Sequence, residues 1–319
     1  MSFRLNQLAS ILIDQSIKEA DHLKIELHTL ESGGRVLDFG VQATGGIEAG
    51  IRLSEICMSG LGKISLTHGT IQNSPFPFVS VRTDHPVEAC LLSQYAGWEI
   101  ACDDFFAMGS GPMRTIAQTE PLFESFPYSE SPERIVGVLE GDRIPDQSVF
   151  DYISEKTETP SSHIDLVIAP TASIAGNLQI ISRSVETVIH KLHELEFDIN
   201  LIQSATGIAP LAPVADNSLN GIGRTNDAIL YGGTVHLMVT GDDEAIRSKG
   251  PQVPANSSPV YGKPFLEIFE DADKDFYKID PHLFSPAVVS FQNISTGKVH
   301  TYGEISESVL ITSFGLSRN

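Results

Sequence analysis

The chain has 319 residues, which is enough to bury a large hydrophobic core and predicts about two domains. Its 21 basic and 41 acidic side chains give a net charge of −20, and the acidic residues are spread along the chain rather than gathered in a tail. This charge disfavours nucleic acid and anionic membranes as partners, because both carry negative charge themselves.

Cysteine content and hydropathy indicate the compartment. The three cysteines form neither a C-x-x-C motif nor an even-numbered disulfide framework, which favours a reducing environment. No run approaches the ~18 continuous apolar residues of a membrane span. We therefore expect a soluble, cytoplasmic protein with no membrane partner.

The first hundred residues alternate between helical and strand patterns. Apolar residues recur every three or four positions within residues 1–20, which predicts an amphipathic helix. Strands at 23–30 and 35–41 flank a Ser-Gly-Gly turn and predict a hairpin. The other elements expected here are helices near 47–58 and 86–95 and strands at 62–67, 78–83 and 98–102.

The glycine motifs do not match a nucleotide site. The segment 107–112, which carries Gly109, Ser110 and Gly111, has the composition of a loop. Neither this segment nor the glycine pairs at 45–46 and 232–233 have the G-x-G-x-x-G spacing, and no P-loop sequence occurs. NAD and ATP sites are therefore disfavoured.

A strand, turn and helix unit opens the second part of the chain. The apolar run 164–169 predicts a buried strand that leads into a helix expected at 173–198. In the turn, Thr171 and Ser173 either cap this helix or leave its N-terminus open for an anionic group. We expect a strand at 199–203 and then a loop at 204–210, which contains Thr206 and Gly207. Because the first part also ends in a glycine-containing loop, we hypothesise two related halves whose loops face one cleft.

The predicted helix 173–198 has a polar flank beside its apolar stripe. Winding the helix at about 100° per residue places four polar side chains in one line: Gln179, Arg183, Glu186 and His190. The ordinary interpretation is an ion pair on a solvated face. The alternative is a carboxylate held beside a fixed positive charge, with Glu186 handling a proton and Arg183 setting its ionisation. The spacing alone leaves both open.

The histidines of this helix raise the alternative of a hydrolytic metal site. His190 and His193 lie on consecutive turns, and His85 is the one obvious distant ligand. The H-E-x-x-H motif is absent, and two histidines on a helix are usually surface residues. A nucleophilic serine has no local support either, since no G-x-S-x-G motif occurs.

The segment 221–235 concentrates polar residues just before an expected apolar strand. Asn226 and Asp227 form an Asx-type turn on the simpler interpretation. The same residues, with Arg224 beside them, also suit the recognition of an amide-rich heterocycle.

Two connectors rich in proline and serine, at 120–132 and 251–264, predict domain edges. We expect one α/β domain from residues 1–125 together with 240–319, and a second from residues 126–239. Near the C-terminus, alternating segments predict strands at 285–292, 298–306 and 310–314.

Several strings of residues, in chain order and nearly end to end, resemble the methenyltetrahydromethanopterin cyclohydrolase family. The strings are 45–50 (GGIEAG), 83–86 (TDHP), 106–112 (FAMGSGP), 169–173 (APTAS), 183–187 (RSVET), 205–207 (ATG) and 223–234 (GRTNDAILYGGT). The resemblance implies a cytoplasmic, metal-free homotrimer whose mixed α/β (α+β) subunit has two α/β domains with a deep pocket between them.

The implied reaction is the reversible hydrolysis of N5,N10-methenyl-tetrahydromethanopterin to the N5-formyl compound, in methanogenesis or formaldehyde oxidation. The substrate rides on a pterin-type one-carbon coenzyme, and no separate cofactor is implied. The family's catalytic arginine and glutamate match Arg183 and Glu186, so Glu186 is expected to take the water proton. Arg183 would keep Glu186 ionised or orient the water.

The resemblance leaves the remaining roles as hypotheses. The candidates for substrate binding are Gly109, Ser110, Gly111, Thr171, Ser173, Thr206, Gly207, Asn226 and Asp227, with Arg224 for the anionic tail. Two other functions stay open, a metal-dependent amidohydrolase that uses His190 and His193, and a pterin-binding protein without activity.

Overall fold

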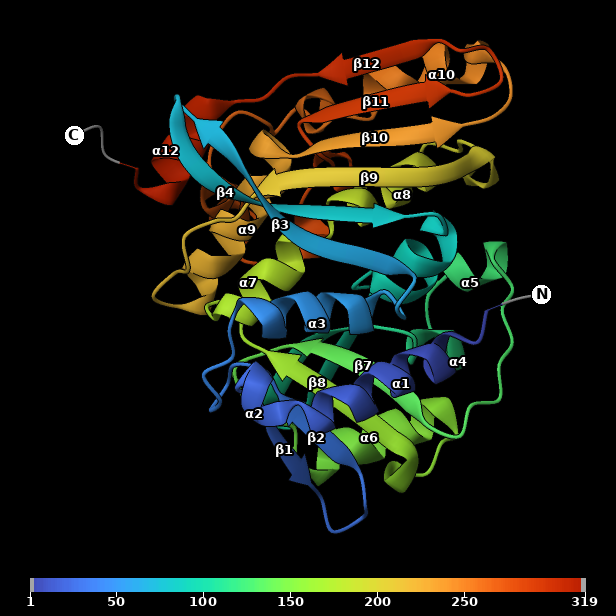
Figure 1. Ribbon diagram of the computed structural model, residues 1–319, viewed down its shortest axis with the longest axis vertical. Coiled ribbons are helices and arrows are strands. Elements are labelled where there is room, and N and C mark those ends of the chain that lie inside the picture. The colour runs from blue at the N-terminus through green and yellow to red at the C-terminus, as the bar shows by residue number, and fades with distance from the viewer. Residues whose placement is uncertain (1–2, 317–319) are drawn as a thin grey trace. The chain divides into compact units, whose positions relative to one another are not determined.

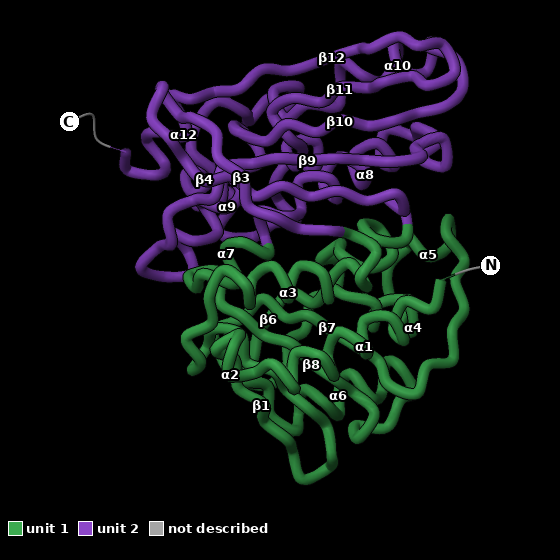
Figure 2. Tube along the Cα trace, viewed as in Figure 1, with its two compact units in different colours: residues 1–62, 88–179 green, residues 63–87, 180–319 purple. Residues whose placement is uncertain are grey.

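The computed structural model describes residues 3–316 and has a mixed α/β fold. The chain forms two compact units (Figure 2). Unit 1 comprises residues 1–62 and 88–179, and unit 2 comprises residues 63–87 and 180–319. Each unit contains one six-stranded sheet with both parallel and antiparallel neighbours.

The sheet of unit 1 has the strand order β1-β2-β8-β7-β6-β5. Figure 1 labels four of its strands, β1, β2, β7 and β8. Its strands are β1 (Glu26–Thr29), β2 (Arg35–Asp38), β5 (Trp98–Cys102), β6 (Phe105–Ser110), β7 (Ile135–Glu140) and β8 (Ile164–Ala169). β2, β8 and β7 run parallel, and the outer pairs are antiparallel. The hairpin expected around the Ser-Gly-Gly turn is confirmed, because β1 pairs with β2 in antiparallel register.

Helices cover both faces of this sheet. Residues of α1 (Leu5–Lys18) and α3 (Ile47–Cys57) share a core with Val167 of β8, whereas α6 (Gln147–Thr157) shares a core with Leu166. Adjacent residues of a strand point to opposite faces, so a strand buried on both sides needs a continuous apolar run. This region also contains α2 (Ala20–Leu23), the π-helix η1 (Val87–Gln94), α4 (Arg114–Ala117), α5 (Leu122–Ser125) and the 3-10 helix η2 (Ser161–His163).

The sheet of unit 2 has the strand order β12-β11-β10-β9-β4-β3 (Figure 1). Its strands are β3 (Gly62–Ile71), β4 (Ser74–Thr83), β9 (Ile202–Pro210), β10 (Thr234–Val239), β11 (Val288–Asn293) and β12 (Val299–Gly303). β10 and β11 run parallel, while β9 is antiparallel to both β10 and β4. The helices are α8 (Ser184–Glu194), α9 (Ser218–Gly232), α10 (Asp243–Lys249), α11 (Phe265–Asp271) and α12 (Glu307–Phe314), and α7 (Ile174–Ile181) ends in this unit.

The predicted domain boundaries differ from the observed units. The chain leaves unit 1 after residue 62, returns at residue 88 and leaves again after residue 179. The reason is strand pairing: β4 pairs with β9 in the second sheet, whereas β7 and β8 belong to the first. Pairing between distant segments is not visible in connector composition.

The strand expected at residues 310–314 is wrong, because this segment lies in the helix α12. Val309, Leu310 and Phe314 are the buried residues of α12, which packs against α9. A short apolar segment fits either structure, and the tertiary contact decides between them. Within residues 3–316, no helix is both long enough and apolar enough to cross a membrane.

A buried carboxylate shapes the loop that follows β2. Asp38 is fully buried, and its two oxygens accept hydrogen bonds from the backbone N–H groups of residues 40–43 at 2.6–2.8 Å. A Cβ on Gly40 would lie 2.7 Å from the side chain of Ser173, so this loop packs tightly against the turn before α7. Asp38 therefore supports the position of that turn.

A second buried carboxylate joins the parallel strands of unit 1. Asp165 of β8 has no exposed side-chain surface, and it accepts two hydrogen bonds each from Arg35 and Arg134 at 2.6–2.8 Å. Bidentate pairs of this kind are among the strongest polar interactions in proteins. The pairing also raises the pKa of Arg35.

We predict that Asp165→Asn lowers the free energy of unfolding by about 3–5 kcal/mol, because it leaves two guanidinium groups without their buried counter-charge. Urea titration of the purified protein measures this change. The matched control is Asp14→Asn, since Asp14 is 58% exposed and contacts Arg35 at 3.3 Å. Equal losses of stability in the two variants would contradict the stabilising role of the buried Asp165 carboxylate.

Candidate active site

The helix expected at residues 173–198 is two helices. α7 ends at Ile181 and α8 begins at Ser184, with Arg183 at the N-cap position of α8. The Arg183 N–H bonds to the carbonyl of Ile180, and its own carbonyl accepts from Thr187 at 2.9 Å. The backbone thus turns at Arg183 and starts a new helix there, which the continuous apolar stripe did not reveal.

Arg183 and Glu186 are both buried at the start of α8. Their exposed fractions are 5% and 4%, so the interpretation as a solvated face is wrong. Glu186 lies in the first turn of α8, where the helix dipole favours a negative charge. Ionised groups are costly to bury, and such placements are common where the charges take part in chemistry.

The polar line of the predicted helix becomes exposed only towards its C-terminal end. Gln179 is 1% exposed, whereas the side chain of His190 is 22% exposed. His190 Nε2 lies 3.9 Å from Glu194 Oε1 on the next turn. Among residues 3–316, no group of three or more His, Cys, Asp or Glu side chains is arranged to hold a metal ion.

The loop expected at residues 204–210 is the central strand β9. Thr206 pairs with Arg82 of β4 on one side and with His236 of β10 on the other. Gly207 faces α8, because a Cβ built on it would lie 2.5 Å from Ser184 Oγ and 3.0 Å from Val185. The absence of a side chain at Gly207 therefore lets α8, with Arg183 at its start, approach the sheet closely.

The loop expected at residues 107–112 is partly wrong as well. Gly109 and Ser110 belong to strand β6, and the positive φ of +83° occurs at Gly111. Ser110 is fully buried and lies 3.3 Å from both the carbonyl of Val138 and Cys57 Sγ. Gly111 donates its N–H to the carbonyl of Ser93.

The turn before α7 uses Ser173 as a cap. Ser173 Oγ accepts from the N–H of Gly176 at 3.0 Å and donates to the carbonyl of Pro170 at 2.8 Å. The capping interpretation of Ser173 is therefore confirmed. Thr171 is buried in the same turn, with 6% of its surface exposed.

The polar segment expected to precede a strand lies in the helix α9. Arg224 donates to the carbonyls of Pro213, Val214 and Ser313 at 3.3–3.4 Å. Asn226 donates to the carbonyl of Ile222, one turn earlier on α9. These contacts hold neighbouring backbone in place, and the Asx-type turn is wrong.

Asp227 is the one acidic residue of the segment 221–235. It is fully buried and accepts from the N–H of Phe265, the first residue of α11, at 2.8 Å. Burial raises the pKa of Asp227 from 3.8 to about 7. The side chain therefore changes charge near neutral pH, in a position that joins α9 to α11.

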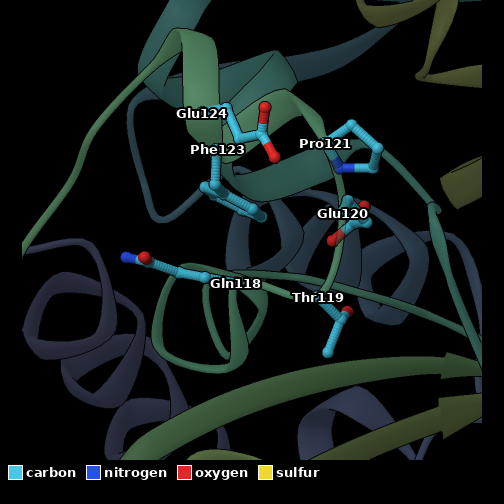
Figure 3. Close-up of a pocket in the computed structure, with 6 residues that line it drawn as sticks. All are labelled: Gln118, Thr119, Glu120, Pro121, Phe123 and Glu124. Carbon is cyan, nitrogen blue, oxygen red and sulfur yellow. The ribbon is translucent and has the colours of Figure 1, made fainter.

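A small hollow of about 250 Å³ occurs in the connector of unit 1 (Figure 3). It is lined by Gln118, Thr119, Glu120, Pro121, Phe123 and Glu124. Glu120 is held by the fully buried Arg114, with 2.6 Å between Oε1 and Nη2. None of the predicted site residues lines this hollow.

Comparison with known proteins identifies the family. The family described as Cyclohydrolase (MCH) matches residues 4–314. The chain belongs to the methenyltetrahydromethanopterin cyclohydrolase family. The resemblance seen in the sequence is confirmed, and the chain is a cyclohydrolase.

Three relatives illustrate the extent of the similarity. The methenyltetrahydromethanopterin cyclohydrolase of Methylobacillus flagellatus is 40% identical over 98% of this chain and 96% of its own length. The enzyme of the same name from Rhodopirellula baltica is 44% identical over 89% and 87%. That of Methanocella arvoryzae is 41% identical over 98% and 99%.

Sequence reasoning missed Lys191, which is 1% exposed and lies on α8 with the predicted catalytic pair. Its position at the border of the apolar stripe was the available signal. A lysine there is more often a surface residue whose alkyl chain covers apolar neighbours.

We predict that Gly207→Ala displaces α8 and lowers both stability and activity. The new methyl group would meet Ser184 Oγ at 2.5 Å, and overpacking of this kind costs about 1–3 kcal/mol. Thermal unfolding and turnover of the variant measure the two effects. Gly46→Ala is the stability control, because nothing lies within 4 Å of a Cβ at that position.

We predict that Asp227→Asn removes a pH dependence of stability. The folded protein keeps the Asp227 proton up to about pH 7, whereas the unfolded chain loses it near 3.8, so stability from this group falls as pH rises between these values. As pH rises from 4 to 8, the free energy of unfolding of the variant should therefore increase by about 1–3 kcal/mol relative to that of the wild type. Urea unfolding of both proteins at pH 4 and pH 8 tests this. The same difference in unfolding free energy between variant and wild type at the two pH values would contradict the prediction.

Proposed function

We propose that this protein catalyses the reversible hydrolysis of N5,N10-methenyl-tetrahydromethanopterin to the N5-formyl compound. The relatives are named as methenyltetrahydromethanopterin cyclohydrolases, which suggests this substrate, and the similarity covers almost the whole of both chains. The observation that carries the proposal is the burial of Arg183 and Glu186 together at the start of α8. Two buried groups of opposite charge suit a reaction that adds water to a cation.

Hydrolysis begins when water attacks the methenyl carbon. The water oxygen forms a bond to this carbon, and one water proton moves to the Glu186 carboxylate, which gives a neutral hydroxyl adduct. Water is a poor nucleophile, and a positioned carboxylate speeds such a step by about 10²–10⁴-fold. The adjacent negative charge also stabilises the cation before the attack.

The adduct then collapses to the formyl product. The bond from the carbon to N10 breaks as the hydroxyl becomes a carbonyl, N10 takes the proton from Glu186, and the carboxylate accepts the hydroxyl proton. Release of that proton to solvent completes the balance of one cation and one water to one formyl compound and one proton. The same steps in reverse form the methenyl compound.

Arg183 has two roles consistent with this scheme. Its positive charge favours the ionised form of Glu186, which must accept a proton. Its planar guanidinium can also donate hydrogen bonds to the attacking water or to the developing formyl oxygen. The family resemblance leads us to expect further a cytoplasmic homotrimer that needs no metal.

We predict that Glu186→Gln lowers kcat about 10²–10⁴-fold, because the amide cannot accept the water proton. The measurement is the decay of the methenyl chromophore after mixing with purified protein, with and without chelator. The control is Glu194→Gln on the same helix, since Glu194 is 49% exposed, and it should keep full activity.

The outcomes separate the three functions. Fast decay with the wild type and none above background with the folded Glu186→Gln variant would support the cyclohydrolase mechanism. Loss of activity with chelator, together with stoichiometric zinc, would favour the metal-dependent amidohydrolase. Coenzyme binding without any turnover by the wild type would leave only a pterin-binding protein.

A further inference from the structure

Lys191 is a buried lysine whose ammonium group makes several hydrogen bonds. The sequence pattern did not point to it, and it has no part in the proposed chemistry. Only 1% of its surface is exposed, and it lies on α8, five residues after Glu186. Its Nζ donates to Ser257 Oγ at 2.9 Å, to the carbonyl of Pro254 at 3.1 Å and to the carbonyl of His282. Three donors therefore meet three oxygen acceptors, which matches the geometry of an ammonium group.

The acceptors are themselves fixed by hydrogen bonds. Ser257 Oγ lies 2.7 and 2.8 Å from the carbonyl oxygens of Gln252 and Pro254, which share its single proton, so its lone pairs are left to accept from Lys191. The adjacent Ser258 donates to Asp280 at 2.5 Å, and Asp280 in turn accepts from the N–H of His282. Two residues of the proline and serine segment 251–264, expected to be a domain edge, thus bond to the end of Lys191.

The charge of Lys191 persists at neutral pH. Burial lowers the pKa of Lys191 to about 8, and the nearby carboxylate of Asp280 acts in the opposite direction. At pH 7 most molecules therefore carry the ammonium form. A neutral amine would have only two hydrogens for its three oxygen partners.

α8 is held by apolar packing on one side and by the hydrogen bonds of Lys191 on another. Val185, Val188 and Leu192 are fully buried, and α8 packs against β9 and β10. Five helical residues correspond to about 7.5 Å along the axis and roughly 140° around it, so Lys191 and Glu186 lie on different sides of the helix. Apolar packing alone tolerates sliding and rotation more readily than a set of directed hydrogen bonds.

We propose that Lys191 is a positioning residue, whose three hydrogen bonds to Pro254, Ser257 and His282 fix the rotation and axial position of α8 and thereby the placement of Glu186 and Arg183. The inference rests on the proposed function of these two residues. It assigns to Pro254 and Ser257 of the segment 251–264 a part in positioning the two proposed catalytic residues through α8. Small displacements of a reacting group are sufficient to slow an enzyme strongly.

The test is Lys191→Met, which keeps the alkyl volume and removes the ammonium. We expect kcat to fall about tenfold or more while KM changes less than about threefold, since a misplaced base slows chemistry more than it weakens binding. Ser257→Ala removes one of the three acceptors and should give the same pattern more weakly. It also keeps the proposal testable if Lys191→Met does not fold.

A double-mutant cycle separates positioning from a general loss of stability. The Lys191→Met change is repeated in a Glu186→Asp background, where the carboxylate is already displaced by one methylene. If Lys191 acts through Glu186, its loss should cost a clearly smaller factor in kcat there than in the wild type. Equal factors in both backgrounds would overturn the proposal.

Hydrogen exchange provides a readout that does not depend on activity. Lys191→Met should speed amide exchange in residues 184–190 at least several-fold, because α8 loses the hydrogen bonds that hold it at Lys191. The control is Lys278→Met, which removes a solvent-exposed ion pair with Asp273 and should change neither exchange in α8 nor turnover. Unchanged exchange in α8 would refute the role of Lys191 even if the wild type proved inactive as a cyclohydrolase, so the two proposals fail separately.

Discussion

The arrangement of the candidate active site depends on the close packing of α8 against β9. Arg183 and Glu186 are buried at the start of α8, and a side chain at Gly207 would collide with Ser184 and Val185 in the same helical turn. β9 is hydrogen-bonded to a strand on both sides, so it presents a rigid surface to the helix. α8 begins directly after Arg183 and packs against β9.

The same solution to buried charge recurs in both units. Asp165 is surrounded by two guanidinium groups, Asp38 accepts four backbone N–H groups, and Lys191 donates to three oxygens. Arg114, also fully buried, bonds to Glu120 and to the carbonyl of Leu91. An ionised group can stay in the interior when most of its hydrogen-bonding capacity is satisfied. Asp165, Lys191 and Arg114 also join segments that are distant in the chain, whereas Asp38 fixes the loop that directly follows it.

Several segments that carry the family resemblance lie inside regular structure. Gly109 and Ser110 are in β6, Thr206 and Gly207 are in β9, and Asp227 is in α9. Small and polar residues at these points permit close packing or hold backbone groups, so their composition resembled that of loops. Small and polar residues occur both in exposed loops and where two elements pack closely. Only the fold shows which of the two situations applies.

The sequence by itself determined the mixed α/β class, most helices and strands of the first hundred residues, the family, and the pair Arg183 and Glu186 as the principal candidates for catalysis. These conclusions depend on local periodicity and on short strings of residues, which a single chain displays directly. Only the tertiary structure decided the division into units, the break between α7 and α8, the strand β9 and the burial of Lys191. Each of these depends on contacts between segments far apart in the chain, such as β4 with β9 and Lys191 with His282, and such pairings leave no periodic trace in the residues that form them.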